Sequence, residues 1–175
     1  MLKVNSDIPD TVFARMEGDT IVPVRARDLF AEGTYVLVGL PGVFTPVCSY
    51  DHMPSLINSA DALKAAGVKG IYVVSDDNPW AIDFWKKTFK NNEKLEFLCD
   101  GNRDFLNASK LACSDSDLFL RGHYGRFYAI IEDNVIRRVR AEVSVLNTVC
   151  TNGDSILSDI DDVMQQANMR ASRSL

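Results

Sequence analysis

The chain has 175 residues, 46% of them hydrophobic, and a formal net charge of −5 from 19 Lys plus Arg against 24 Asp plus Glu. This length suits one globular domain whose core needs neither disulfides nor a metal for stability. The negative charge argues against nucleic-acid binding, and the apolar stretches are far shorter than the roughly 20 residues of a membrane-spanning helix. Because the first residues do not resemble a signal peptide, we expect a soluble, cytoplasmic protein with neither nucleic-acid nor membrane partners.

Cysteine and histidine are sparse and scattered. The four cysteines lie far apart in the sequence, and the chain has two histidines. No C-x-x-C motif and no close Cys/His cluster occurs, so a tetrahedral zinc site and a thioredoxin-type dithiol are both disfavoured. We therefore expect no metal, and we interpret the cysteines as free thiols rather than a disulfide scaffold.

Strand and helix patterns alternate through the first half of the chain. Apolar pairs on either side of Gly18 predict an N-terminal hairpin, with Gly18 providing the positive φ of its turn. Residues 35–38 form an apolar run typical of a strand buried on both faces, and a loop follows. A helix is expected from Thr45 toward Leu56, with Pro54 as a kink or break. A second helix is expected over residues 59–66, with Gly67 just after its end.

The second half continues the alternation and ends in a hairpin and a helix. Residues 70–75 and 95–99 are predicted strands, and Asn78 followed by Pro79 predicts a helix start between them. Trp80, Phe84 and Trp85 on that helix are expected in the core or beside the site. The remaining expected elements are a helix over 104–111, a hairpin of strands 126–131 and 135–141, and a helix over 155–167.

This order of elements predicts a fold class. Alternating strands and helices indicate one α/β domain spanning residues 1–175, with a mixed central β-sheet flanked by helices on both faces. Right-handed crossovers place the loop after residues 35–38 at the carboxyl edge of the sheet. Open α/β sheets carry their sites at that edge, so this loop is the first place to look for function.

Cys48 follows that loop and begins a predicted helix. Thr45 suits the N-cap and Pro46 the first helical position, so Cys48 falls in the first turn. There its sulfur would lie near free backbone N–H groups at the positive end of the helix dipole, which favours the nucleophilic thiolate. The alternative is a small buried packing residue, which is the usual role of a free cysteine.

Pro41, Thr45 and Cys48 form the pattern P-x-x-x-T-x-x-C, which resembles the active-site signature of the peroxiredoxins. The longer segment 38–54 resembles the type 5 subfamily, also called the atypical two-cysteine or redoxin group. The segment that runs from residues 76–80 to Trp85 and the pair at 126–127 are similar to further subfamily segments in the same order. The resemblance implies a thioredoxin-like fold, a homodimer, and thiol-dependent reduction of hydrogen peroxide or alkyl hydroperoxides without metal or organic cofactor.

The resemblance also implies site roles. Cys48 would attack the peroxide and become a sulfenic acid, with Arg126 holding the thiolate and polarising the leaving oxygen. Thr45 would hydrogen-bond the peroxide, although the N-cap needs the same oxygen, and Pro41 would shield the sulfur from water. For His52, four residues after Cys48, we favour an orienting or packing role over that of a general base, because a thiolate needs no base.

Cys150 aligns with the resolving cysteine of the atypical two-cysteine members. The expected cycle is an intramolecular disulfide with Cys48 that thioredoxin reduces; the alternative is a one-cysteine cycle using glutathione or glutaredoxin. Cys99 and Cys113 are interpreted mainly as packing residues, and His123 as a loop residue. Two rival functions remain: a thiol:disulfide oxidoreductase, which Thr45 in place of a first cysteine disfavours, and a non-enzymatic redox-sensing module.

Overall fold

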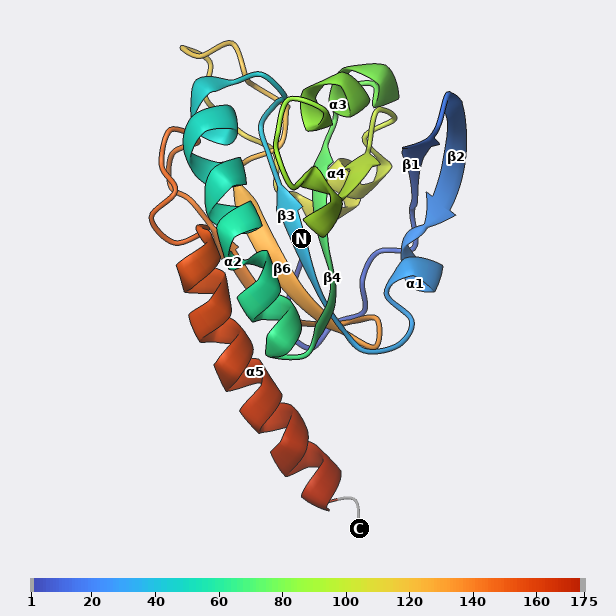
Figure 1. Cartoon of the computed structure of the whole chain (residues 1–175), viewed down its shortest axis with the longest axis vertical. Helices are drawn as coiled ribbons and strands as arrows, with labels where there is room; N and C mark the ends of the chain where they lie inside the picture. Colours follow the sequence, from blue (N-terminus) through green and yellow to red (C-terminus); the bar gives the residue numbers. More distant parts are fainter. Residues whose placement is uncertain (1, 174–175) are drawn as a thin grey trace.

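A computed structural model describes residues 2–173 of the chain. Its elements alternate much as the sequence predicts, and Figure 1 shows them around one central sheet. In chain order they are β1 (Val12–Glu17), β2 (Thr20–Arg25), α1 (Ala26–Leu29), β3 (Thr34–Gly39), η1 (Cys48–His52), α2 (Met53–Ala65), β4 (Val68–Ser75), α3 (Pro79–Lys86), η2 (Asn92–Lys94), β5 (Glu96–Cys99), α4 (Asp104–Ser109), β6 (Phe127–Glu132), β7 (Val135–Ala141) and α5 (Gly153–Arg173).

The sheet has seven strands in the order β2-β1-β5-β4-β3-β6-β7. Strands β3, β4 and β5 run parallel, and the outer pairs are antiparallel, so the predicted mixed sheet is confirmed. Both predicted hairpins are present. Gly18 has a φ of 60° at the β1–β2 turn, and Asp133 and Asn134 have positive φ at the β6–β7 turn, as the twist of tight hairpins requires.

Each face of the sheet buries its own apolar core. Leu56 from α2 and Ile160 from α5 pack on one face, and Phe30 and Phe105 cover the other beside α1 and α4. The prediction of helices on both faces is therefore confirmed. Figure 1 shows α2 and α5 side by side, with the C-terminal half of α5 extending past the sheet. Within residues 2–173, no helix is both long and apolar enough to cross a bilayer.

The helical segment after the site loop differs from the prediction. The two helices expected over 45–56 and 59–66 are one continuous segment, in which η1 is a π-helical turn that leads directly into α2. The N–H of Met53 donates to the carbonyl of Cys48, five residues back, so the register changes just before Pro54. Pro54 lies inside this continuous segment directly after the π-helical turn, so the change of register accommodates its missing N–H and the helix does not break there. The helix ends at Ala65 with Ala66 as its C-cap, and Gly67, whose φ is 105°, occupies the predicted C′ position.

Helix α3 also corrects an expectation. Asn78 caps it by accepting the N–H of Ala81, as predicted for its start. Trp85 is buried as expected, whereas Trp80 and Phe84 are 56% and 70% exposed, so a core position is wrong for these two and their alternative position beside the site stays a prediction. An eight-residue helix on a sheet has room to bury only one stripe of side chains, and Trp80 and Phe84 fall outside it.

Candidate active site

Cys48 is the first residue of η1 and is completely buried. The preceding residues are already helical, because Ser49 donates its N–H to the carbonyl of Thr45. The cysteine thus lies in the first turn, as predicted, although that turn is π-helical rather than α-helical. The loop between β3 and η1 is fixed at its middle, since Val43 donates its N–H to the carboxylate of Asp77 at 2.9 Å.

Arg126 brings a buried guanidinium to Cys48. Its Nη2 donates to the Cys48 Sγ at 3.3 Å, and the side chain is 1% exposed. Nε and Nη2 both donate to the carbonyl of Val145, at 3.2 and 2.7 Å. A guanidinium is permanently charged and cannot accept, so the sulfur faces a fixed cation whose orientation is set by several acceptors.

His52 is the third acceptor of Arg126 and lies one helical turn beyond Cys48. Its Nδ1 is 2.8 Å from Arg126 Nη1, and its Nε2 is 2.7 Å from the carbonyl of Thr151. Because Arg126 only donates, Nδ1 accepts and the proton is on Nε2. Burial, followed by the positive charge of Arg126, lowers the pKa of His52 to about 3. The ring is therefore neutral near pH 7, which suits the orienting role better than that of a base.

Thr45 and Pro41 both belong to the loop that leads from β3 to Cys48. The Thr45 hydroxyl donates to the carbonyl of Gly42 at 2.9 Å. In the described residues this hydroxyl caps no helix N–H, so the predicted capping bond is wrong. The loop has a positive φ of 59° at Phe44, and the Thr45 hydroxyl binds Gly42 behind this bend instead of a helix N–H. With its proton engaged, the Thr45 oxygen is left as an acceptor. Pro41 is buried at the start of this loop.

Cys150 lies in the loop between β7 and α5 and is half-buried. Its Sγ is 3.6 Å from the carbonyl of Ala141, and its N–H donates to Glu142 Oε1 at 2.8 Å. Partial burial, followed by the negative charge of Glu142, raises the pKa of the Cys150 thiol. All four cysteines are free thiols. The carbonyl of Thr151, the residue after Cys150, accepts a hydrogen bond from His52, so the Cys150 segment lies directly against the Cys48 site.

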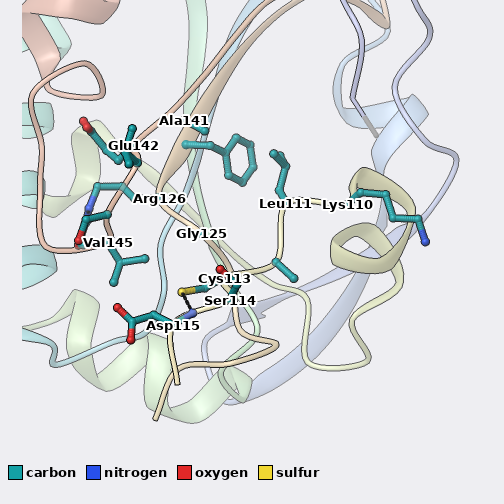
Figure 2. Close-up of a pocket in the computed structure, with 14 residues that line it drawn as sticks. Lys110, Leu111, Cys113, Ser114, Asp115, Gly125, Arg126, Ala141, Glu142 and Val145 are labelled. Carbon is teal, nitrogen blue, oxygen red and sulfur yellow. Dashed lines mark hydrogen bonds between the residues drawn. The ribbon is translucent and has the colours of Figure 1, made fainter. Parts of the chain in front are cut away.

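The other cysteines and His123 do not touch Cys48. Cys99 is buried and donates to the carbonyl of Asp77, which agrees with a packing role. Cys113 is half-exposed and lines a cavity of about 400 Å³ that also borders Arg126, and Figure 2 shows the N–H of Asp115 donating to its sulfur. His123 lies beside the buried carboxylate of Asp76, at 2.9 Å. No trio of His, Cys, Asp or Glu within residues 2–173 is arranged to hold a metal ion.

A buried thiol beside a fixed guanidinium can react as a stabilised thiolate nucleophile. The sequence model of the Redoxin family matches residues 3–152 of the chain. The chain is a peroxiredoxin of the redoxin family. Peroxiredoxin-2C of Oryza sativa is 32% identical over 163 residues, which cover 93% of this chain and 96% of the rice protein. The hybrid peroxiredoxin hyPrx5 of Haemophilus influenzae is 30% identical over 135 residues, covering 77% of this peroxiredoxin and 56% of the hybrid protein.

Solved structures of peroxiredoxins also match the fold of this chain. Reduced Prx3 from Vibrio vulnificus in complex with H2O2 matches with a TM-score of 0.85 and 28% identity, over 91% of this chain and 99% of that one. The fold is thus the thioredoxin-like fold of peroxiredoxins, and the protein is a thiol-dependent peroxidase, as the sequence resemblance implied.

Three contributors to the site were not anticipated from the sequence: the carbonyl of Val145, Thr151 and Glu142. Two of them act through backbone carbonyls, which carry no sequence signal. Glu142 is an ordinary acidic residue at the end of a strand, and only the folded loop brings its carboxylate to Cys150 and Thr151.

Proposed function

We propose that this peroxiredoxin reduces hydrogen peroxide and alkyl hydroperoxides with Cys48 as the peroxidatic nucleophile. The observation that carries the assignment is the 3.3 Å contact between Arg126 Nη2 and the Cys48 sulfur inside a closed site. The guanidinium stabilises the thiolate before reaction and the negative charge that develops on the leaving oxygen during it. Thr45 accepts a hydrogen bond from the peroxide O–H and thereby orients it, and Pro41 limits the access of water.

The reaction step balances without a cofactor. The Cys48 thiolate attacks the terminal peroxide oxygen, an S–O bond forms and the O–O bond breaks with its electron pair on the departing oxygen. That oxygen takes up a proton and leaves as water or an alcohol. The sulfur is oxidised to a sulfenic acid, and the peroxide is reduced.

For the second half of the cycle we propose that Cys150 resolves the sulfenic acid. Its sulfur attacks the Cys48 sulfur, the S–O bond breaks and water leaves, so a disulfide remains. The contact between His52 and the carbonyl of Thr151, next to Cys150, supports this pairing. Cys150 also borders a surface hollow of about 450 Å³, which suits reduction by an external dithiol of the thioredoxin type.

We also propose that the protein forms a homodimer. Phe44 on the site loop and Trp80 and Phe84 on α3 are 59%, 56% and 70% exposed, which suits a surface that a second copy covers in a homodimer. The cytoplasmic location expected from the sequence stays a prediction.

Peroxide consumption with dithiothreitol as reductant tests the nucleophile. Cys48→Ser is expected to consume peroxide no faster than buffer, because serine does not form the thiolate. Cys113→Ser is the matched control and is expected to retain the wild-type rate. Wild-type turnover by Cys48→Ser would overturn the assignment of Cys48.

Mass analysis under non-reducing conditions, after one equivalent of peroxide, tests the resolving step. A Cys48–Cys150 disulfide in the wild type, replaced by a lasting sulfenic acid in Cys150→Ser, is the expected pair of results. A sulfenic acid that persists in the wild type would exclude resolution by Cys150. Turnover with glutathione and glutaredoxin, but not with thioredoxin, would then indicate the one-cysteine cycle.

A further inference from the structure

Glu142 follows the last residue of β7 and binds the loop that carries Cys150. A single carboxylate oxygen, Oε1, accepts three hydrogen bonds: from the N–H of Cys150 at 2.8 Å, the N–H of Thr151 at 3.0 Å and the hydroxyl of Thr151 at 2.9 Å. Thr151 is completely buried. Hydrogen bonds to an ionised carboxylate are about twice as strong as neutral ones, so this oxygen is a strong anchor of the segment.

The same residue is tied to Arg126. The backbone N–H of Glu142 donates to the carbonyl of Arg126 at 2.9 Å. From the Glu142 carboxylate the contacts run through Thr151 to His52, and from His52 back to the Arg126 guanidinium. Glu142 therefore closes a ring of hydrogen bonds that starts and ends at the arginine touching the Cys48 sulfur.

We propose that Glu142 is a positioning residue whose carboxylate joins the two halves of the cycle: it fixes His52 and Arg126 around Cys48 through Thr151, and it holds Cys150 back from Cys48. The first effect speeds the reaction with peroxide, because a guanidinium held in one orientation stabilises the thiolate without reorganisation. The second effect slows disulfide formation, because the Glu142 carboxylate holds the N–H of Cys150 and so restrains the movement of its sulfur toward Cys48. This second effect rests on the proposed resolving role of Cys150, whereas the first does not.

One substitution is expected to change the two rates in opposite directions: oxidation of Cys48 becomes slower and disulfide formation becomes faster. Glu142→Gln keeps the size of the side chain but removes the charge, so the three bonds weaken together. Loss of this anchor raises the rate at which the loop that carries Cys150 opens. It also leaves His52 and Arg126 less ordered. A residue that merely stabilised the fold would lower both rates or neither.

Amide hydrogen exchange tests the anchor itself. In Glu142→Gln the amides of Cys150 and Thr151 are expected to exchange about tenfold faster than in wild type, with the sheet unchanged. Asp154→Asn is the matched control, because it removes the same charge from an exposed carboxylate at the start of α5. Thr151→Val removes one of the three bonds and is expected to give a smaller change in the same direction. Unchanged exchange in Glu142→Gln would overturn the proposal.

Stopped-flow tryptophan fluorescence tests the link to the reactive sulfur, since the Trp85 indole donates to Ser49, the neighbour of Cys48. In a Cys150→Ser background, where no resolving disulfide can form, Glu142→Gln is expected to slow the oxidation of Cys48 by peroxide about fivefold. Asp154→Asn in the same background is expected to leave the rate unchanged. An equal rate with and without Glu142 would overturn the link to Arg126, whatever the role of Cys150.

The rate of disulfide formation tests whether Glu142 restrains Cys150. With Cys150 present, Glu142→Gln is expected to form the Cys48–Cys150 disulfide about tenfold faster after oxidation, and to accumulate less sulfinic acid at high peroxide. A slower or equal rate would overturn the restraint on Cys150. A wild-type protein that forms no such disulfide would overturn the resolving role and this restraint with it, while the fluorescence result still decides the link to Arg126.

Discussion

The surroundings of Cys48 and Cys150 have opposite electrostatic character. Cys48 is fully buried, and its sulfur lies 3.3 Å from the Arg126 guanidinium. Cys150 is half-buried beside the Glu142 carboxylate, which together with partial burial raises the pKa of its thiol. One sulfur is thus placed where a negative charge is stabilised, and the other where a negative charge is opposed.

This difference fits the order in which the two thiols react in the proposed cycle. A thiolate attacks peroxide far better than a thiol, so in the proposed cycle the cysteine beside the cation is the one that reacts with peroxide. In the proposed cycle, Cys150 remains bound to Glu142 through its backbone N–H until Cys48 carries an electrophilic sulfenic acid. The loop between β7 and α5, which carries Cys150, also supports the Cys48 site. Its Val145 carbonyl binds Arg126, and its Thr151 carbonyl binds His52.

The largest effect is expected from changing the cation. Arg126→Lys keeps the charge but loses the fork that reaches Cys48, His52 and Val145 together, so we expect the rate of Cys48 with peroxide to fall about 10²-fold. Stopped-flow measurement of that rate is the test. Arg140→Lys is the control, because the Arg140 guanidinium binds Asp159. If Arg126→Lys reacted at the wild-type rate, the contrast between the two cysteines would not depend on the guanidinium.

The sequence predicted correctly those features that depend on residues close together in the chain. The β-strand runs, the two hairpin turns and the Asn78–Pro79 helix start all depend on neighbouring residues, and the structure has each of them. The P-x-x-x-T-x-x-C pattern likewise located Cys48 at a helix start. The meeting of Cys48 with Arg126, far apart in the chain, followed from a family resemblance and not from the residues alone.

The remaining features depend on contacts that no local pattern records. At Cys48 the chain forms a π-helical turn, in which the N–H of Met53 binds a carbonyl five residues back, whereas Pro54 in the sequence suggested a kink or break. The Thr45 hydroxyl faces Gly42 because the loop bends at Phe44, so the expected cap is missing. Glu142 contributes only once the chain has folded around it.

A smaller effect is expected on the pH dependence of stability. His52 has a folded-state pKa of about 3 against an ordinary value of 6.5, so the unfolded chain binds the proton more tightly. As the pH falls below about 6.5, the free energy of unfolding falls, and His52 alone contributes a loss of about 2 kcal/mol between pH 7 and pH 5. His52→Gln, which does not titrate, is expected to remove that loss. Denaturant unfolding of both proteins at the two pH values measures it, and an equal pH dependence in both would show that His52 is not held neutral by the site.

The smallest effect is expected away from both cysteines, where α5 is fastened to the sheet. Tyr128 on β6 is fully buried and donates its hydroxyl to Asp159 of α5, whose carboxylate also accepts from Arg140 at 2.6 and 2.9 Å. Burial and the charge of Asp159 raise the pKa of Tyr128, so the phenol remains a donor. Tyr128→Phe leaves Asp159 its partner Arg140, and we therefore expect the free energy of unfolding to fall by only about 1 kcal/mol in urea denaturation.

The same variant separates stability from chemistry. Tyr128 contacts neither Arg126 nor His52 in the hydrogen bonds of the described chain, so the rate of Cys48 with peroxide is expected to stay at the wild-type value in Tyr128→Phe. Tyr50→Phe, on the exposed side of η1, is the control and is expected to change neither quantity. A slower reaction in Tyr128→Phe would mean that the anchoring of α5 reaches the active site. The Glu142 ring would then be only one of two routes by which the C-terminal part of the chain positions Arg126.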